Sequence, residues 1–149
     1  MSQEDIELVI GVFTLAGSPE VDMGALMADD EHWQRNKEKL GEDLKITFFN
    51  PSDAHLNIME QEFRGLDGLR EGWDVWMLPW DKFRVTVDDM IDTSAGSVLM
   101  LGSAIVRIKG TGADFPQEVA SLFRIEAGKI VEIGYYLDQD QARRDAGLA

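Results

Sequence analysis

The chain has 149 residues, 44% hydrophobic and 28% charged, which are the proportions of one globular domain with its own core. Its net charge of −14 argues against nucleic acid and anionic membrane surfaces as partners, because both are themselves negative. The absence of cysteine excludes disulfides, thiolate nucleophiles and cysteine-ligated metals. The start MSQEDIELVI is too acidic for a secretory signal, and no apolar run reaches the roughly 20 residues of a membrane span. We therefore expect one cytoplasmic domain over residues 1–149.

Helical patterns dominate the first third of the chain. Ser2 caps a predicted helix, because a serine oxygen can accept from the free backbone N–H groups of a first turn. Ser18 and Pro19 predict the start of a second helix, since proline is favoured at the first helical position. Residues 29–43 mix charges of both signs and are interpreted as a solvated helix or loop. The apolar stripe of the first helix recurs at i, i+3, i+4 and i+7 and comprises Ile6, Val9, Ile10 and Phe13.

Two strands and a third helix are predicted next. Residues 44–50 form the first strand and residues 59–64 a short second one, with a loop that contains His55 between them. The helix opens at Gly65 and ends or kinks at Pro79. Its bulky apolar residues at helical spacing are Leu66, Leu69, Trp73, Trp76, Met77 and Trp80. This stripe is either plain core packing or one wall of a cavity.

A meander of antiparallel strands completes the predicted sheet. Strands cover residues 83–92 and 97–109, and a hairpin over residues 115–138 turns at residues 126–128, where Gly128 can take a positive φ. Both faces of the 97–109 strand are largely apolar, so helices should cover one face and a second subunit the other. Asp138 caps a last short helix. Helices segregated from strands define the α+β class, and such a sheet can curl into a cone around three helices of the N-terminal half.

Two hydroxyl groups interrupt the apolar faces of the hairpin. Because successive strand residues point to opposite faces, Ser121 shares an apolar face with Phe123, and Tyr135 lies on the apolar face of the next strand. Such a hydroxyl is either a satisfied core group or part of a ligand pocket. Ser121 lacks a G-x-S-x-G elbow and is interpreted as a pocket hydroxyl rather than a nucleophile. For Tyr135, donation to a ligand and a hydrogen bond to the backbone both stay open.

Acidic and histidine side chains offer further candidates. His55 suits a general base, because imidazole titrates near neutrality, or it is a surface histidine. Glu60 and Glu62 share one strand face, which suits acid–base or metal chemistry, or they form a solvated edge. The acids between Asp88 and Asp92 have no histidine or cysteine beside them and are interpreted as solvated turn acids. We therefore predict no metal and no cofactor.

Motifs spread along nearly the whole chain are residues 28–30 (ADD), 63–73 (FRGLDGLREGW), 122–125 (LFRI), 128–131 (GKIV) and 136–138 (YLD). In these motifs the sequence resembles the nuclear transport factor two-like superfamily, and within it the SnoaL-like polyketide cyclases and ketosteroid isomerases. The resemblance implies a single SnoaL-like domain with a cystatin-like α+β barrel. It says little of activity, because this fold hosts isomerases, cyclases, epoxide hydrolases, dehydratases and non-catalytic binders.

The resemblance also implies where catalytic groups would stand, and each position holds a different residue here. Phe13 stands where ketosteroid isomerases place an oxyanion-holding tyrosine, and Asn50 where they place an aspartate general base. Ser121 replaces both their second oxyanion donor and the acid–base aspartate of the cyclases. Because an amide cannot take a proton from carbon at neutral pH, we do not expect isomerisation or aldol cyclisation by those mechanisms.

The sequence therefore predicts binding of a small apolar molecule in the cone. Cofactor-independent conversion of that molecule, by isomerase, cyclase, lyase or epoxide hydrolase-like chemistry, stays open. The alternative is a non-catalytic ligand-binding or dimeric interaction module, and a homodimer is expected to pack through the outer face of the sheet. The predicted lining residues are Phe13, Asn50, His55, Trp76, Ser121, Phe123 and Tyr135.

Overall fold

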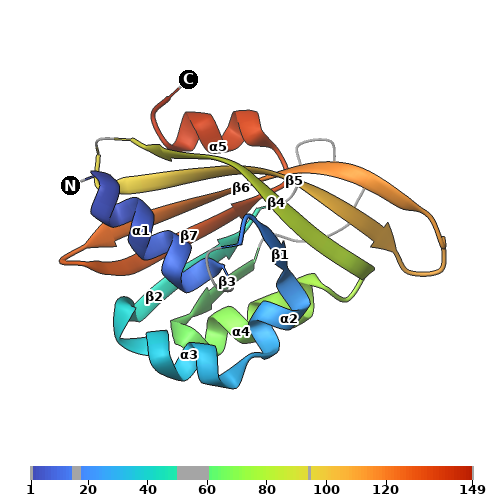
Figure 1. Cartoon of the computed structure of the whole chain (residues 1–149), viewed down its shortest axis with the longest axis horizontal. Helices are drawn as coiled ribbons and strands as arrows, with labels where there is room; N and C mark the ends of the chain where they lie inside the picture. Colours follow the sequence, from blue (N-terminus) through green and yellow to red (C-terminus); the bar gives the residue numbers. More distant parts are fainter. Residues whose placement is uncertain (1, 15–17, 50–60, 94, 149) are drawn as a thin grey trace.

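One curled sheet organises the molecule, and helices lie on both of its sides (Figure 1). The computed structural model describes residues 2–14, 18–49, 61–93 and 95–148. Among the helices described there, none combines the length and apolar character needed to cross a membrane. The elements follow in the order α1 (Ser2–Phe13), β1 (Glu20–Asp22), α2 (Met23–Ala28), α3 (Asp30–Asn36), the 3-10 turn η1 (Lys37–Lys39), β2 (Leu40–Phe48), β3 (Gln61–Arg64), α4 (Gly65–Trp76), β4 (Trp80–Asp92), β5 (Ser97–Ile108), β6 (Asp114–Glu126), β7 (Lys129–Tyr136) and α5 (Gln139–Asp145).

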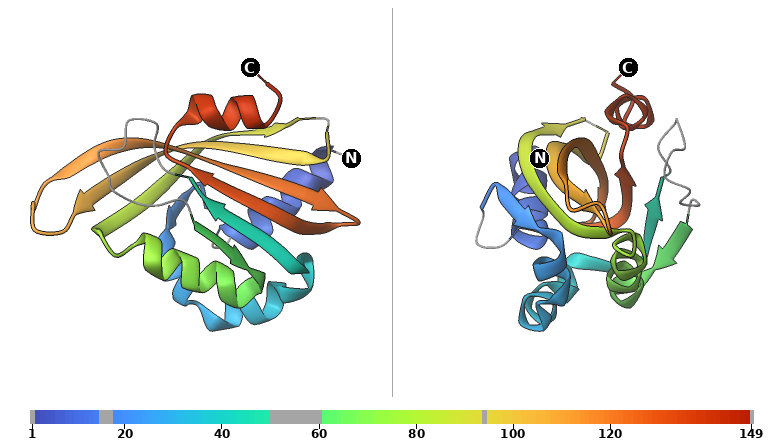
Figure 2. Two further views of the ribbon diagram at one scale, coloured as in Figure 1. Left: turned by 180° about the vertical axis from the view of Figure 1, so that it is seen from behind. Right: turned by 90° about the vertical axis from the view of Figure 1, so that its right-hand side faces the viewer.

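The strands form a mostly antiparallel sheet that curls without closing. Its seven strands are ordered β1-β4-β5-β6-β7-β2-β3. β2 runs parallel to β7, while the other neighbouring pairs are antiparallel. The right-handed twist of the long strands β4 to β6 bends the sheet around its concave face (Figure 2). The α+β class predicted from the sequence is confirmed.

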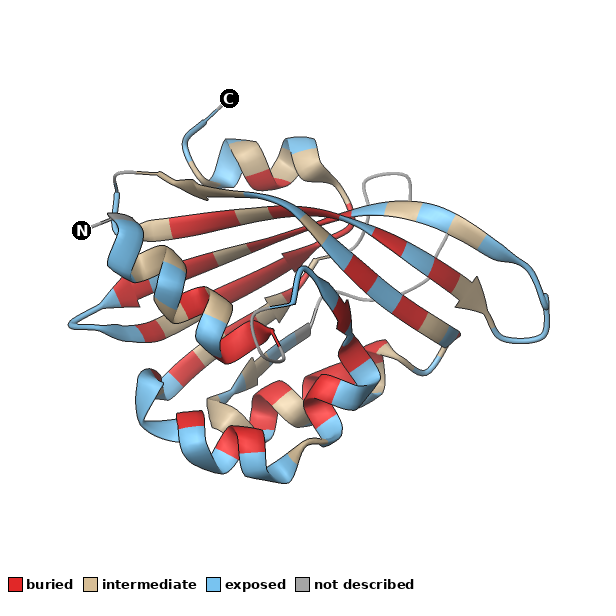
Figure 3. Ribbon diagram, in the orientation of Figure 1, coloured by how far each residue is buried: buried red, intermediate tan, exposed pale blue. Residues whose placement is uncertain are grey.

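Burial alternates along the strands and separates two faces of the sheet, most visibly on β4 (Figure 3). The concave face packs against α1 and α4 and forms the main core, in which Ser121 and Phe123 of β6 are both buried. A second, smaller core lies on the outer face under α5 and is formed by Leu99, Leu101, Ala120, Tyr136 and Ala142. The C-terminal helix of the chain itself therefore covers part of the face where the sequence suggested a second subunit.

The β6–β7 hairpin turns through two residues in the left-handed region. Glu126 pairs with Lys129, and between them Ala127 has φ 53° and Gly128 has φ 75°. Positive φ at both central residues is the pattern of a type I′ turn, whose twist matches that of the flanking strands. Gly128 was expected to take this conformation. Ala127 takes it as well, although its Cβ makes the left-handed region unfavourable.

The second helix begins later than Ser18 and Pro19 predicted. The Ser18 hydroxyl accepts a hydrogen bond from the Glu20 amide at 3.2 Å, which makes a turn rather than a helix start. The short strand β1 follows, paired with β4, and α2 begins at Met23. Asp22 is its N-cap, and its carboxylate accepts from the Ala25 amide at 3.1 Å.

The charged segment 29–43 contains a surface helix as expected, with Asp30, Glu31 and Arg35 of α3 exposed, but the other face of α3 is buried. His32, Trp33 and Asn36 are buried there. The His32 Nε2 hydrogen bonds to the Val12 carbonyl at 2.6 Å, and the Trp33 indole N–H donates to the Leu26 carbonyl at 2.9 Å. These bonds hold α3 against α1 and α2, and the surrounding charges hid that role in the sequence.

Glycine lets α4 approach the sheet closely. A Cβ built on Gly72 would lie 2.7 Å from Cε1 of Phe48 and 2.9 Å from Cδ2 of Phe63. Real Cβ atoms do not approach other atoms so closely, and two aromatic rings cannot move without disturbing the core. Gly72 therefore sets the distance between α4 and the strands β2 and β3.

We predict that Gly72→Ala destabilises the protein by about 1–3 kcal/mol, the usual result of overpacking a core. Gly11→Ala is the matched control, because Gly11 also lies within a helix and a Cβ built on it would come no closer than 4.0 Å to the Lys39 ammonium nitrogen. The control should gain up to about 1 kcal/mol from the better helix propensity of alanine. Urea unfolding of both variants measures this, and a Gly72→Ala protein as stable as the parent would contradict the packing argument.

Candidate functional site

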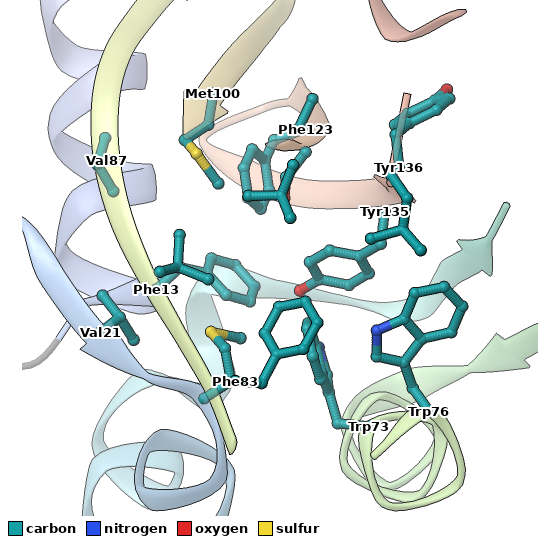
Figure 4. Close-up of a pocket in the computed structure, with 16 residues that line it drawn as sticks. Phe13, Val21, Trp73, Trp76, Phe83, Val87, Met100, Phe123, Tyr135 and Tyr136 are labelled. Atoms are coloured by element: carbon teal, nitrogen blue, oxygen red, sulfur yellow. The ribbon is translucent and has the colours of Figure 1, made fainter. Parts of the chain in front are cut away.

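A small cavity of about 50 Å³ lies between the helices and the concave face of the sheet (Figure 4). Roughly 10–15 Å³ is enough for one water molecule, so this space suits a small group rather than a large ligand. Phe13 of α1, Trp73 and Trp76 of α4 and Phe83 of β4 contribute aromatic walls. Two methionines in the wall, Met23 and Met100, have flexible side chains that can adjust to a ligand.

The structure places five predicted lining residues in this wall: Phe13, Trp76, Ser121, Phe123 and Tyr135. The other two, Asn50 and His55, lie outside the described residues. Trp73 also lines the cavity, although the list of predicted lining residues did not include it. Helical spacing had placed it in one stripe with Trp76, as part of a possible cavity wall, and the structure places both tryptophans in that wall.

One row of residues crosses four strands on the concave face. Met100 of β5 pairs with Ser121 of β6, Ser121 pairs with Tyr135 of β7, and Tyr135 pairs with Phe48 of β2. Directly opposite residues point to the same side of a sheet, so these four side chains stand together. Register alone therefore brings both predicted hydroxyl groups into one wall.

The ring of Tyr135 is held between two other aromatic rings. It stacks on Phe48, with 5.1 Å between centroids, and meets Trp73 edge to face at 4.9 Å. Its hydroxyl points into the space ringed by Phe13, Phe83 and Trp73 (Figure 4). Burial raises the pKa of the Tyr135 phenol well above its ordinary value, and the Trp73 indole N–H beside the phenol oxygen lowers it, although the two groups do not have the geometry of a full hydrogen bond.

Two polar atoms at this cavity have no hydrogen-bond partner among the described protein groups. They are the Tyr135 hydroxyl and the indole nitrogen of Trp73. Tyr135 is 6% exposed and Trp73 4%, so bulk water does not satisfy either group. Buried polar groups are nearly always paired in native proteins, and an unpaired one calls for an explanation. Of the two interpretations left open for Tyr135, a hydrogen bond to the backbone is therefore not observed.

The described wall of the cavity carries no aspartate, glutamate, histidine, lysine or arginine side chain. Tyr136 stands at its rim, but its ring points away, and its hydroxyl donates to the Asp145 carboxylate at 2.8 Å (Figure 4). Within the described ranges no group of three or more potential ligands is placed to hold a metal ion. Ser121 thus has no described base in the wall that could activate it as a nucleophile.

The other acidic candidates lie on the surface. Glu62 is exposed and forms an ion pair with Arg64 at 2.9 Å, which fits the solvated-edge interpretation; Glu60 lies outside the described residues. Asp88 is exposed and accepts a hydrogen bond from the Ser103 hydroxyl at 2.6 Å. Neither Glu62 nor Asp88 contributes to the cavity wall.

An outer cleft of about 590 Å³ lies between α2 and α4 and shares Met23 and Trp73 with the inner cavity. Arg70 crosses it, with Nε 2.9 Å from the Met27 carbonyl oxygen and an ion pair to Asp30. The remaining charged lining residues are the acids Asp67, Glu71 and Asp74. Met23 and Trp73 therefore contact both spaces.

The fold agrees with the comparisons to known proteins. The SnoaL-like domain family matches residues 21–133, and the chain belongs to this family. No curated protein matches the sequence significantly. The resemblance to this group that the sequence motifs suggested is therefore confirmed at the level of the family.

Several solved structures share the fold at low sequence identity. A putative SnoaL-like polyketide cyclase from Jannaschia sp. CCS1 is 16% identical, with a TM-score of 0.64 over 99% of this chain and 94% of that chain. TerC, co-crystallised with polyporic acid, is 12% identical, with a TM-score of 0.64 over 97% and 98%. A phenazine biosynthesis-related protein from Pseudomonas aeruginosa is 13% identical, with a TM-score of 0.61 over 99% and 83%. At such identities these likenesses show the fold alone.

We predict that neither of the two tyrosines, Tyr135 and Tyr136, ionises in the folded protein near pH 10, although the ordinary pKa of a tyrosine side chain is 10.0. Burial raises the pKa of both, and the Asp145 carboxylate raises that of Tyr136 further. Because the unfolded chain releases these protons first, the free energy of unfolding should be unaffected by them below pH 10 and fall above it. Ultraviolet titration of tyrosinate, in buffer and in denaturant, measures this; a normal titration of the folded protein would contradict the buried placement.

Proposed function

We propose that this chain binds a small, largely apolar molecule in the cavity between α1, α4 and the concave face of the sheet. The observation that carries the proposal is an aromatic cavity lined by Tyr135 and Trp73, each of which has a buried polar atom without a partner among the described protein groups. A ligand with a polar atom would satisfy them, while its apolar body would contact the rings. Co-crystallisation of TerC with polyporic acid agrees with ligand binding in this fold.

The described residues favour binding without acid–base chemistry. A general base must reach the proton that it removes, and the described wall offers no carboxylate or imidazole for that role. Phe13 and Ser121, which replace the family's catalytic groups, both line the cavity. Conversion of the ligand without a cofactor, by isomerase, cyclase, lyase or epoxide hydrolase-like chemistry, is the second candidate, which similarity to the Jannaschia protein favours.

We predict that Ser121→Leu fills the cavity and weakens binding at least tenfold for small apolar compounds such as toluene and cyclohexanone. Trp73 and Trp76 line the cavity, so tryptophan fluorescence together with thermal shift should report occupancy. Ser103→Leu is the matched control, because Ser103 lies on the neighbouring strand but is exposed. Equal binding by the parent and Ser121→Leu would contradict this location, and chromatography of the bound compounds would detect any conversion.

The partner predictions from the sequence also stay proposals. The net charge of −14 supports the proposal that the protein does not bind nucleic acid or anionic membranes, because both are negatively charged. A cytoplasmic location is proposed together with it. A homodimer through the outer face is supported by a groove of about 360 Å³ beside α5, lined in part by Phe49, Leu122 and Tyr136. A second copy placed there would cover apolar surface that α5 leaves open.

We predict a dimer in sedimentation velocity at micromolar concentration, and a shift to monomer in Leu122→Glu, because the new charge would be buried in the interface without a partner. Lys129→Glu is the control, since Lys129 is exposed at the hairpin turn. A monomeric parent protein would end the dimer proposal without affecting the cavity.

A further inference from the structure

The two unpartnered polar atoms of the cavity indicate what kind of ligand fits it. The geometry points to a two-donor site, in which the Tyr135 hydroxyl and the Trp73 indole N–H together bind the uncharged carbonyl oxygen of a small ketone, aldehyde or ester. This inference rests on the proposed function, which leaves the chemistry of the ligand open. It assigns binding roles to Tyr135 and to Trp73, which the sequence placed in the tryptophan stripe but not among the predicted lining residues.

The two donors are fixed in place by their aromatic neighbours. Phe48 on one side and Trp73 on the other restrict the ring of Tyr135, so its hydroxyl stays directed into the cavity. Trp73 is itself held by Phe48 at 5.5 Å and Phe83 at 5.9 Å. The ring centroids of Tyr135 and Trp73 are 4.9 Å apart and both residues line the same cavity, so one ligand atom placed between them can accept from both.

A ligand atom that satisfies these two groups must accept hydrogen bonds. An indole N–H is a donor only, so the group that satisfies Trp73 needs a lone pair. Tyr135 stays protonated because burial raises its pKa, and it therefore also has a hydrogen to donate. An ammonium group has no lone pair and cannot satisfy either donor.

The surroundings of the cavity favour a neutral acceptor. The described wall has no lysine, arginine or histidine to balance an anion, and a buried charge without a partner is strongly unfavourable. The net charge of −14 also repels anions from the protein as a whole. A carbonyl oxygen meets each condition, since it is uncharged and its two lone pairs can accept from both donors.

The test compares cyclohexanone with methylenecyclohexane, which has nearly the same shape but carries a CH₂ group in place of the oxygen. The ratio of their dissociation constants is measured by thermal shift and fluorescence for the parent protein, Tyr135→Phe and Tyr136→Phe. We expect the preference for the ketone to fall about tenfold in Tyr135→Phe, equivalent to about 1.4 kcal/mol. It should be unchanged in Tyr136→Phe, because that hydroxyl is bonded to Asp145 on the other face of the strand.

Stability without ligand gives a second readout. Tyr135→Phe removes a buried hydroxyl that has no protein partner and should raise the midpoint of thermal unfolding by about 2–4 °C. Tyr136→Phe breaks a hydrogen bond and should lower it. A ketone preference that survives in Tyr135→Phe, or a lower midpoint for that variant, overturns the two-donor site but leaves binding in the cavity intact. Failure of the parent to bind either compound, or any other apolar probe, contradicts the proposed function itself.

Discussion

The aromatic contact among Phe48, Trp73 and Tyr135 is the interaction on which the rest of this structure depends. Phe48 belongs to β2, Trp73 to α4 and Tyr135 to β7, so the three rings join the helix layer to two neighbouring strands. Aromatic pairs add about 0.5–1.5 kcal/mol beyond the area that they bury. The contact requires α4 to lie close to β2, which the missing side chain of Gly72 permits.

The same aromatic contact has a cost in stability that only binding of a ligand would offset. It holds the hydroxyl of Tyr135 and the indole nitrogen of Trp73 in an apolar interior where no described protein group satisfies them. A core optimised for stability alone would place phenylalanine and leucine at such positions. Retaining two unsatisfied polar groups is understandable if a molecule from outside the chain supplies the missing acceptor.

The fold was largely predictable because its strands carry regular signals. Alternation placed Ser121 beside Phe123 in the concave wall, and Gly128 marked the hairpin turn. The sequence did not reveal the strand β1, because Ser18 and Pro19 fit a helix start as well as the turn that they form. It also did not reveal the buried His32, whose partner is a backbone carbonyl twenty residues earlier in the chain.

The site was predictable only in part, for a physical reason. Strand periodicity tells which face a residue points to, but it does not tell which polar group will lack a partner. That property depends on the three-dimensional positions of Phe48, Trp73 and Tyr135, which come from separate parts of the chain. The sequence therefore identified the Tyr135 hydroxyl as a candidate and left its bonding state undecided.

The order of strands in the sheet has a consequence for how the chain folds during synthesis. β2 is made early but lies between β3 and β7, and β7 is the last strand to be made. Until the ribosome releases the C-terminal third, β2 has only the short strand β3 to pair with, and the rings of Phe48 and Trp73 lack their partner on β7. Such distant pairing slows folding and exposes apolar surface to aggregation or to chaperones in the meantime. A nascent chain that ends before β7 therefore lacks the strand that joins the two halves of its sheet.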